Sequence, residues 1–170
     1  MKKLFILTSI LFLIAFPAMS QSKFAHVNTQ TLIDTIPSRI KAINEINELS
    51  QKGEQELKEL ETQLEKAYNE YLTRKPTQSE AMNQYDESRL QKMQQDAQNR
   101  EQEISTLLQN LSATMNEKTL KTVKDAIAII ASKKGLNYVI DENSTLYSTG
   151  VNITNEVITE LLRIDALSAN

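Results

Sequence analysis

The chain is 170 residues long and contains 19 Lys and Arg residues, 22 Asp and Glu residues and no cysteine. The lack of cysteine excludes a disulfide framework, and the slightly acidic balance argues against a nucleic-acid-binding protein, in which a basic stripe is expected. Aromatic residues make up 5% of the sequence and there are only three glycines and three prolines, so an extended helical shape is favoured over a globule with many loops.

The first twenty residues have the layout of a secretory signal peptide. A basic start at Lys2 and Lys3 is followed by a mainly apolar run over residues 4–16 and by small residues that end at Ser20, which is the pattern that a signal peptidase cleaves. The run is shorter than the roughly 20 apolar residues that a membrane-spanning helix needs, so an uncleaved anchor is the less favoured alternative. We expect residues 1–20 to be removed next to Gln21, which leaves 17 basic and 22 acidic residues in an exported chain.

The exported chain is expected to begin with a strand and to continue into a long helix. Residues 24–28 alternate between apolar and polar side chains, as a strand with one buried face does. For residues 29–36 the sequence allows either a loop or one or two helical turns. From Ser38 to Leu72, apolar residues recur at spacings of three and four, which is typical of a coiled-coil seam. The seam consists of Ile36, Ile43, Ile46, Leu57, Leu60, Leu64, Ala67 and Tyr71.

The seam is interrupted at Ser50 and Gly53, which occupy successive positions where a coiled coil has apolar residues. Neither residue fills a hole in a facing helix, and glycine in a helix interior costs about 1 kcal/mol relative to alanine. These two residues therefore predict a flexible point in the arm. The alternative interpretation is that a bulky side chain of a second helix packs against the small residues.

A proline in the middle of the chain predicts the tip of a helical hairpin. Pro76 disfavours helix in the residue before it, and Thr77 and Glu80 match a capping box for a new helix. A connection this short favours two antiparallel helices with a tip near residues 73–78.

The second helix is expected to run from about Ser79 to Lys134 and to end at Gly135, which can adopt the left-handed cap conformation. Its methionines have two compatible interpretations. They fill the core between the two helices, or they offer a flexible and polarizable surface to varied apolar partners. The candidates for this contact are Met82, Met93 and Met115.

Strands from both ends of the exported chain are expected to form a small body. Residues 136–141 alternate like a strand, and residues 145–147 are expected to pair with them as a hairpin. Thr154 is expected to cap a final helix. The predicted fold is α+β and mainly α: a discontinuous body of residues 21–37 and 135–170, with the helical-hairpin arm of residues 38–134 inserted between its two parts.

A body of this size offers little material for a core, and open sheet edges can pair with another chain. We therefore expect the chain to associate through its strands, with a monomer whose arm folds over its own sheet as the alternative. The residues assigned to association are Phe24, Val27, Tyr138, Val139, Ile140 and Leu146.

Residues that would support catalysis or cofactor binding are scarce. The single histidine, His26, lies in the first predicted strand without convergent partners, so a structural role is favoured over metal or acid–base chemistry. Gly53, Gly135 and Gly150 are isolated in the sequence, so no phosphate-binding loop is indicated. We expect a protein that is not an enzyme and that binds no cofactor and no metal.

In the order of its elements, the chain resembles the Skp/OmpH-like family of periplasmic chaperones. The specific similarity lies in the strand segments 23–28 and 136–141 and in the stretch from Leu146 through Asn152 to Thr154 that leads into the last helix. The resemblance implies a homotrimer in which the bodies form a β-barrel-like hub and three helical arms enclose a cavity. It further implies a periplasmic holdase that binds unfolded outer-membrane proteins without ATP and prevents their aggregation.

The charge of the chain differs from that of the best-known enterobacterial members, which are strongly basic. Contact with anionic lipid or lipopolysaccharide is therefore not expected to carry over, and Arg74 and Lys75 at the arm tip are the basic pair placed where such a contact could survive. The alternative function is a structural or adaptor coiled coil that spaces components of the cell envelope. A spacer is expected to have an unbroken seam, which this chain lacks.

Overall fold

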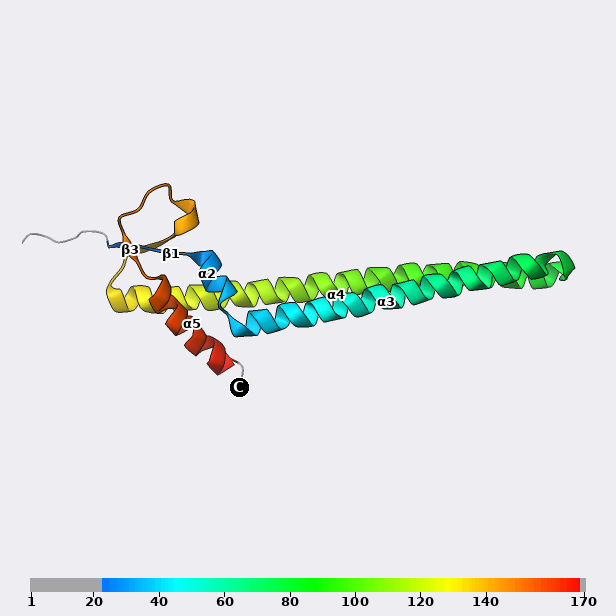
Figure 1. Ribbon diagram of the computed structural model, residues 1–170, viewed down its shortest axis with the longest axis horizontal. Helices are drawn as coiled ribbons and strands as arrows, with labels where there is room; N and C mark the ends of the chain where they lie inside the picture. Colours follow the sequence, from blue (N-terminus) through cyan, green and yellow to red (C-terminus); the bar gives the residue numbers. More distant parts are fainter. Residues whose placement is uncertain (1–22, 169–170) are drawn as a thin grey trace, which may run out of the picture.

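A computed structural model describes residues 23–168, which form a small body at one end and a long helical hairpin that projects from it (Figure 1). This arrangement confirms the predicted α+β, mainly helical fold class. The predicted signal peptide and its cleavage site lie outside the described residues. No described helix carries an apolar stretch long enough to cross a membrane. The elements are β1 (Phe24–Val27), α2 (Thr29–Asp34), α3 (Pro37–Arg74), the 3₁₀ turn η1 (Lys75–Thr77), α4 (Glu80–Lys134), β2 (Tyr138–Asp141), the 3₁₀ turn η2 (Glu142–Ser144), β3 (Val151–Asn152) and α5 (Thr154–Ser168).

The sheet has three parallel strands in the order β2-β1-β3, so the N-terminal strand lies in the middle. Phe24 pairs with Tyr138 of β2, and Ala25 pairs with Val151 of β3 on the other side. The hairpin makes this pairing possible because α4 runs back along α3 and returns the chain to the body (Figure 1).

The prediction that residues 145–147 pair with the preceding strand as a hairpin is wrong. After β2 the chain enters η2, where the Thr145 N–H donates to the Glu142 carbonyl at 3.1 Å and the Thr145 hydroxyl donates to the Asp141 carbonyl at 3.2 Å. The predicted hairpin turn spans residues 142–144, and three-residue hairpin loops typically include a residue with a positive φ angle. Among residues 23–168, Gly135 is the residue with a positive φ angle. Residues 145–150 therefore do not fold back on β2 but lead to β3 at the opposite edge of the sheet.

The core of the body lies between the sheet, α2, α5 and the last turns of α4. The alternation along β1 turns Ala25 and Val27 toward the helices, and both are buried. A fully buried Val, Leu or Ile side chain contributes about 1.5–3 kcal/mol relative to an exposed one. The end of α4 thus belongs to the core of the body, while the rest of α4 belongs to the arm. The ten buried core residues are Ala25, Val27, Leu32, Ile36, Val123, Ala126, Ile130, Ile153, Val157 and Leu161.

Polar side chains fasten the helices of the body to one another. The Asn28 side chain caps α2 by accepting from the Thr31 N–H at 2.9 Å, and Asp165 of α5 accepts from the Ser38 N–H in the first turn of α3 at 3.1 Å. Thr154 was predicted to cap α5, but it is the first residue of that helix, and its hydroxyl accepts from the Asn28 N–H at 3.0 Å. α5 is therefore tied both to the end of β1 and to the base of the arm.

The arm is the antiparallel hairpin of α3 and α4 that the sequence predicts. α3 begins at Pro37, whose fixed φ angle suits the first helical position. α4 is capped by Ser79, whose side chain accepts from the Met82 N–H at 3.4 Å, whereas Thr77, the predicted cap, lies in η1. Gly135 ends α4 in the left-handed conformation with a φ of 62°, which confirms that prediction.

Candidate functional sites on the sheet face and the arm

The face of the sheet that points away from the helices is apolar and open. Phe24 and Tyr138 are partners across β1 and β2, and their rings stack with centroids 5.0 Å apart and an interplanar angle of 12°. Ile140 lies two residues further along β2, on the same face, and is also exposed. In the part of the chain that the structure describes, the outer edges of β2 and β3 have no further strand beside them. A second copy of the body would cover such a face and such edges.

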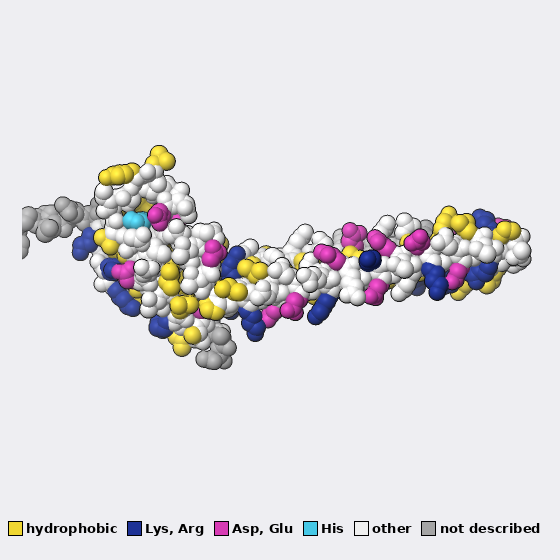
Figure 2. Space-filling view, viewed as in Figure 1, with side chains coloured by type: hydrophobic (Ala, Val, Ile, Leu, Met, Phe, Trp, Pro, Cys, Tyr) yellow, Lys and Arg dark blue, Asp and Glu magenta, His cyan; other side chains and the backbone are white. Residues whose placement is uncertain are grey.

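The loop between η2 and β3 adds apolar surface to this side of the body. Leu146 and Tyr147 are almost fully exposed, and Figure 2 shows hydrophobic side chains at the end of the loop that rises from the body. Ser148 holds the loop to the sheet: its hydroxyl lies 3.2 Å from Nδ1 of His26 and accepts from the Gly150 N–H at 3.1 Å. Within residues 23–168, no group of three or more His, Cys, Asp and Glu side chains is arranged to hold a metal ion.

The structure divides the residues assigned to association into two sets. Successive residues of a strand point to opposite sides of a sheet, and Val27 and Val139 point toward the helices. These two residues pack in or against the core of their own body and are not available to another chain. The residues that are exposed on the open face or in its loop are Phe24, Tyr138, Ile140 and Leu146.

Within the arm, Gly53 is buried and lies directly beneath Ile104 of α4. Ser50 is half-buried, and its hydroxyl donates to Glu54 of the same helix at 3.4 Å. At Gly53 this geometry supports the alternative interpretation, in which a bulky side chain packs against a small residue. A flexible point at Ser50 and Gly53 stays a prediction.

Two of the three candidate methionines lie between the helices of the arm. Met93 and Met115 are half-buried, as expected for residues that fill the core of the hairpin. Met82 is exposed near the tip. Met82 is therefore the member of this set that a partner could contact without opening the hairpin.

An ion pair that sequence analysis did not identify joins the two helices in the middle of the arm. Arg100 of α4 donates to both carboxylate oxygens of Glu56 of α3, at 2.8 and 3.0 Å, and to Glu103 at 3.0 Å. The hydrogen bond from Arg100 lowers the pKa of the Glu56 carboxyl. Bidentate pairs of this kind are geometrically specific, so this pair helps to fix the register of the hairpin. Glu56 lies 18 residues before the end of α3 and Arg100 lies 20 residues after the start of α4. This near symmetry about the turn is the signal that could have revealed the pair.

The two basic residues at the tip are engaged within the hairpin. The Lys75 ammonium lies 3.3 Å from Glu87 and 5.1 Å from the centre of the Tyr71 ring, and Tyr71, which is only 4% exposed, donates its hydroxyl to the same carboxylate. The hydrogen bond with Glu87 raises the pKa of Tyr71, and the bonds from Tyr71 and Lys75 lower the pKa of Glu87. Arg74 lies 3.6 Å from the buried Asp86. Both cations therefore have carboxylate partners.

Next to this ion-pair cluster, α3 and α4 form a groove of about 710 Å³. Tyr68 and Leu72 from α3 and Leu90 from α4 contribute apolar side chains to it. Figure 2 shows hydrophobic side chains gathered at the tip of the arm, whereas acidic side chains are spaced along its middle. The groove requires both helices in their observed register, and the sequence alone did not reveal it.

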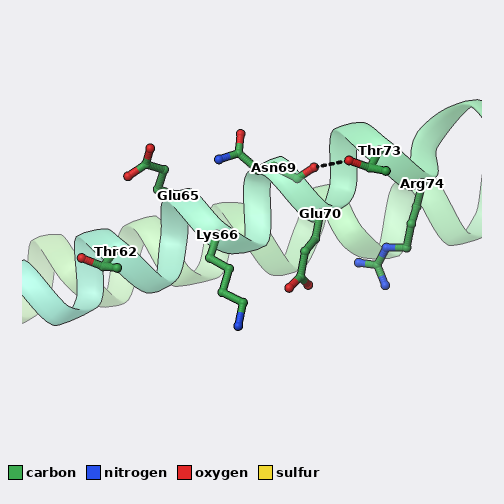
Figure 3. A pocket seen from close by; sticks show the side chains of 7 residues that line it. All are labelled: Thr62, Glu65, Lys66, Asn69, Glu70, Thr73 and Arg74. Atoms are coloured by element: carbon green, nitrogen blue, oxygen red, sulfur yellow. Dashed lines mark hydrogen bonds between the residues drawn. The ribbon is translucent and has the colours of Figure 1, made fainter.

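A second hollow lies on the outer side of α3 alone (Figure 3). Its side chains are polar or charged, and Glu65 and Lys66 point to opposite sides of the helix. The hydrogen bond within this set runs from the Thr73 hydroxyl to the Asn69 carbonyl at 2.9 Å, inside the same helix. Binding sites place polar groups so that they converge on a ligand, and this hollow has no such arrangement.

Comparison with known proteins connects this architecture to a family. The family described as "Outer membrane protein (OmpH-like)" matches residues 23–161. The chain is 29% identical, over 175 residues, to proteins named Chaperone protein Skp from Photorhabdus laumondii subsp. laumondii and Photorhabdus luminescens, and each alignment covers 95% of this chain and 99% of the relative. A crystal structure from Caulobacter crescentus CB15, described as an outer membrane chaperone (OmpH-like), has the same fold with a TM-score of 0.72 at 12% identity, over 88% of both chains. The chain belongs to the OmpH-like family.

Proposed function

We propose that this chain is a periplasmic holdase that binds unfolded outer-membrane proteins and other exported proteins without ATP and prevents their aggregation. The observation that carries the proposal is the number of large apolar side chains that stay exposed on the arm outside its seam. Apolar surface that gathers on a soluble protein marks a contact site, and relatives named Chaperone protein Skp support a chaperone role. The exposed apolar residues of the arm are Ile40, Tyr68, Leu72, Met82, Tyr85, Leu107, Leu111 and Leu120.

The proposed assembly is a homotrimer that forms through the open sheet face. The stacked pair of Phe24 and Tyr138, together with Ile140, supplies apolar surface for the contact. α3 contains 38 residues, so each arm would project roughly 57 Å from the hub. Three arms of this length would enclose a cavity in which many weak apolar contacts hold a client, with no catalytic step and no nucleotide.

The proposed compartment is the periplasm, reached by export with cleavage between Ser20 and Gln21. The support comes from the basic start, the short apolar run and the small residues that precede Gln21. Mass spectrometry of the protein recovered from periplasmic extract should show a chain that begins at or next to Gln21. A full-length product in the membrane fraction would overturn this localisation.

The proposed holding activity can be tested by diluting a urea-denatured outer-membrane protein into buffer with and without the purified chain. Light scattering should fall as the chain is added and reach its minimum near one trimer per client, with the same curve in the presence and absence of ATP. Unchanged scattering at a large excess of trimer would refute the holdase. That result would favour the alternative function of a structural spacer, which the close contact between Gly53 and Ile104 also suits.

A further inference from the structure

We infer that the groove beside the arm tip binds extended peptide segments in which aromatic or aliphatic side chains are flanked by Lys or Arg. The inference rests on the proposed holdase function, and it adds where on the arm a client segment lies and which segments are preferred. We call this surface the tip groove. It is defined by Leu64, Tyr68, Leu72 and Leu90, with Glu61 and Glu65 on its rim.

The floor of the tip groove is apolar and accessible. Tyr68 is 50% exposed and Leu72 is 47% exposed, although both lie on the side of α3 where α4 forms the other wall. The volume of about 710 Å³ falls within the range, on the order of 300–1,000 Å³, of known ligand sites. Removing the exposed surface of these two side chains from water would supply most of the affinity for an apolar segment.

The charge of the tip groove favours basic side chains in the ligand. Its cation, Lys75, lies 3.3 Å from Glu87 and is already compensated. Glu61 and Glu65 are exposed on the rim, and neither forms an ion pair with any of residues 23–168. Two uncompensated carboxylates beside an apolar floor attract Lys and Arg and repel Asp and Glu.

The wall that α4 contributes suits the backbone of an extended segment. Gln91 and Gln94 line this side of the groove, and a side-chain amide both donates and accepts hydrogen bonds. The N–H and C=O groups of an unfolded segment need such partners, whereas those of a folded protein are paired within its own secondary structure. The tip groove therefore selects unfolded segments over folded surfaces.

The inference can be tested by fluorescence polarisation with the mature full-length chain and three fluorescein-labelled peptides. The peptides share an alternating Tyr-Leu centre and carry two Lys, two Ser or two Glu residues at each end. We expect the affinity to fall in that order, with about a tenfold difference between the Lys and Glu peptides. The difference should shrink when NaCl is raised to about 0.5 M, since salt screens exposed charges. Equal affinity for the three peptides at low salt would overturn the inference.

A pair of matched double variants tests the location of the binding site. Tyr68→Ser with Leu72→Ser removes the floor of the tip groove. Leu167→Ser with Leu162→Ser removes side chains of α5 that are 66% and 37% exposed and do not line the groove. Both variants change exposed residues, and circular dichroism and thermal melting check that each is folded. The first variant should weaken binding of the Lys peptide at least about tenfold and the second less than about twofold.

Equal losses in the two double variants would overturn the inference, because binding would then depend on exposed apolar surface in general and not on the tip groove. Glu61→Gln with Glu65→Gln should abolish the preference for Lys over Glu and keep the affinity for the Ser peptide. An undiminished preference would contradict the role of the rim. A parent chain that fails to suppress client aggregation refutes the proposed holdase whatever the peptides show. A parent that suppresses aggregation but binds peptides independently of the tip groove refutes only this inference.

Discussion

Ile104 of α4 occupies the space into which a side chain on Gly53 of α3 would project, since a Cβ atom at residue 53 would lie 2.8 Å from Cγ2 of Ile104. Isoleucine in a helix has one strongly preferred χ1 rotamer, so this methyl group cannot easily swing aside. The contact holds the two helices close together at this height of the arm. This geometry indicates that the seam has a glycine at residue 53 because α3 and α4 approach closely there, and not because the arm bends there.

Gly53→Leu is therefore expected to lower the free energy of unfolding by about 1–3 kcal/mol through overpacking. The loss should shrink in the Ile104→Ala background, where the methyl group is absent. Urea unfolding followed by circular dichroism measures all four proteins of this double-mutant cycle, and we expect a coupling energy of at least about 1 kcal/mol.

Ser50→Ala is the control for this cycle, because Ser50 lies in the same helix and its hydroxyl bonds to Glu54 of that helix. Alanine has the higher helix propensity, so a gain of up to about 0.5 kcal/mol is expected. If Gly53→Leu instead stabilised the protein while large clients were no longer held, the flexible-point prediction would be favoured.

Ile140→Asp is expected to dissociate the proposed trimer and to leave the body folded. Ile140 is exposed in the single chain, so a carboxylate there stays hydrated in a monomer, but it would be buried without a partner in the assembly at a cost of several kcal/mol. Sedimentation velocity should show the monomer, with a circular dichroism spectrum like that of the parent. Sedimentation as a trimer would contradict association through the open sheet face.

Val139→Asp is the matched control, one residue away on the same strand. Val139 packs against the core of its own body, so the same substitution should unfold the body as well as prevent assembly. Val139→Asp should lose the thermal transition of the body, whereas Ile140→Asp should keep it. This difference would separate a defect in folding from a defect in assembly.

A chain with a shortened arm is expected to keep an associating body. Arg39 donates to Asn116 across the base of the arm at 3.0 Å. Val123 is the first residue of α4 that belongs to the core of the body. Replacing residues 44–111 by a short glycine-containing turn therefore leaves the core complete. Light scattering should give a trimer that no longer suppresses aggregation. A monomer would indicate that the arms, and not the sheet face, join the copies.

Acid is expected to destabilise the fold below about pH 4. Hydrogen bonds with Arg163 and Lys134 lower the pKa values of Glu160 and Glu156, respectively. A carboxylate whose pKa is lower in the folded state stabilises the fold above its unfolded pKa, and this contribution is lost as the pH falls through the folded value. Tm should be nearly constant between about pH 7 and 5 and fall below about pH 4, less steeply in Glu160→Gln than in the exposed control Glu48→Gln.

The helices could be predicted because the features that define them are local. The three–four spacing identifies both helices of the arm, and Gly135 marks the end of α4 in the conformation expected for a C-cap. The cap of α4 was misplaced by two residues because Thr77 and Ser79 are both suitable. In η1 the Thr77 hydroxyl donates to the Arg74 carbonyl at 3.0 Å. Ser79, and not Thr77, is therefore the residue that caps α4.

The sheet topology and the candidate sites could not be predicted, because they depend on contacts between distant segments. Residues 145–147 alternate like a strand, yet Leu146 is fully exposed in a loop. The strand that does pair with β1 has two residues, Val151–Asn152, which is too short for a periodic signal. The tip groove likewise joins Leu72 to Leu90, and only the register of the hairpin brings them together.

The central position of β1 has a consequence for how the chain is completed. β1 is made first, but the strands that flank it, β2 and β3, follow about 110 and about 125 residues later. The hairpin of α3 and α4 can form from contacts between its own two helices. Once formed, it brings β1 and β2, the two ends of the intervening segment, to the base of the arm. This lowers the entropic cost of closing the sheet. A chain interrupted before residue 138 would therefore carry a finished arm on an unclosed body. In the proposed assembly, such a chain would lack Tyr138 and Ile140 of the sheet face that joins the copies.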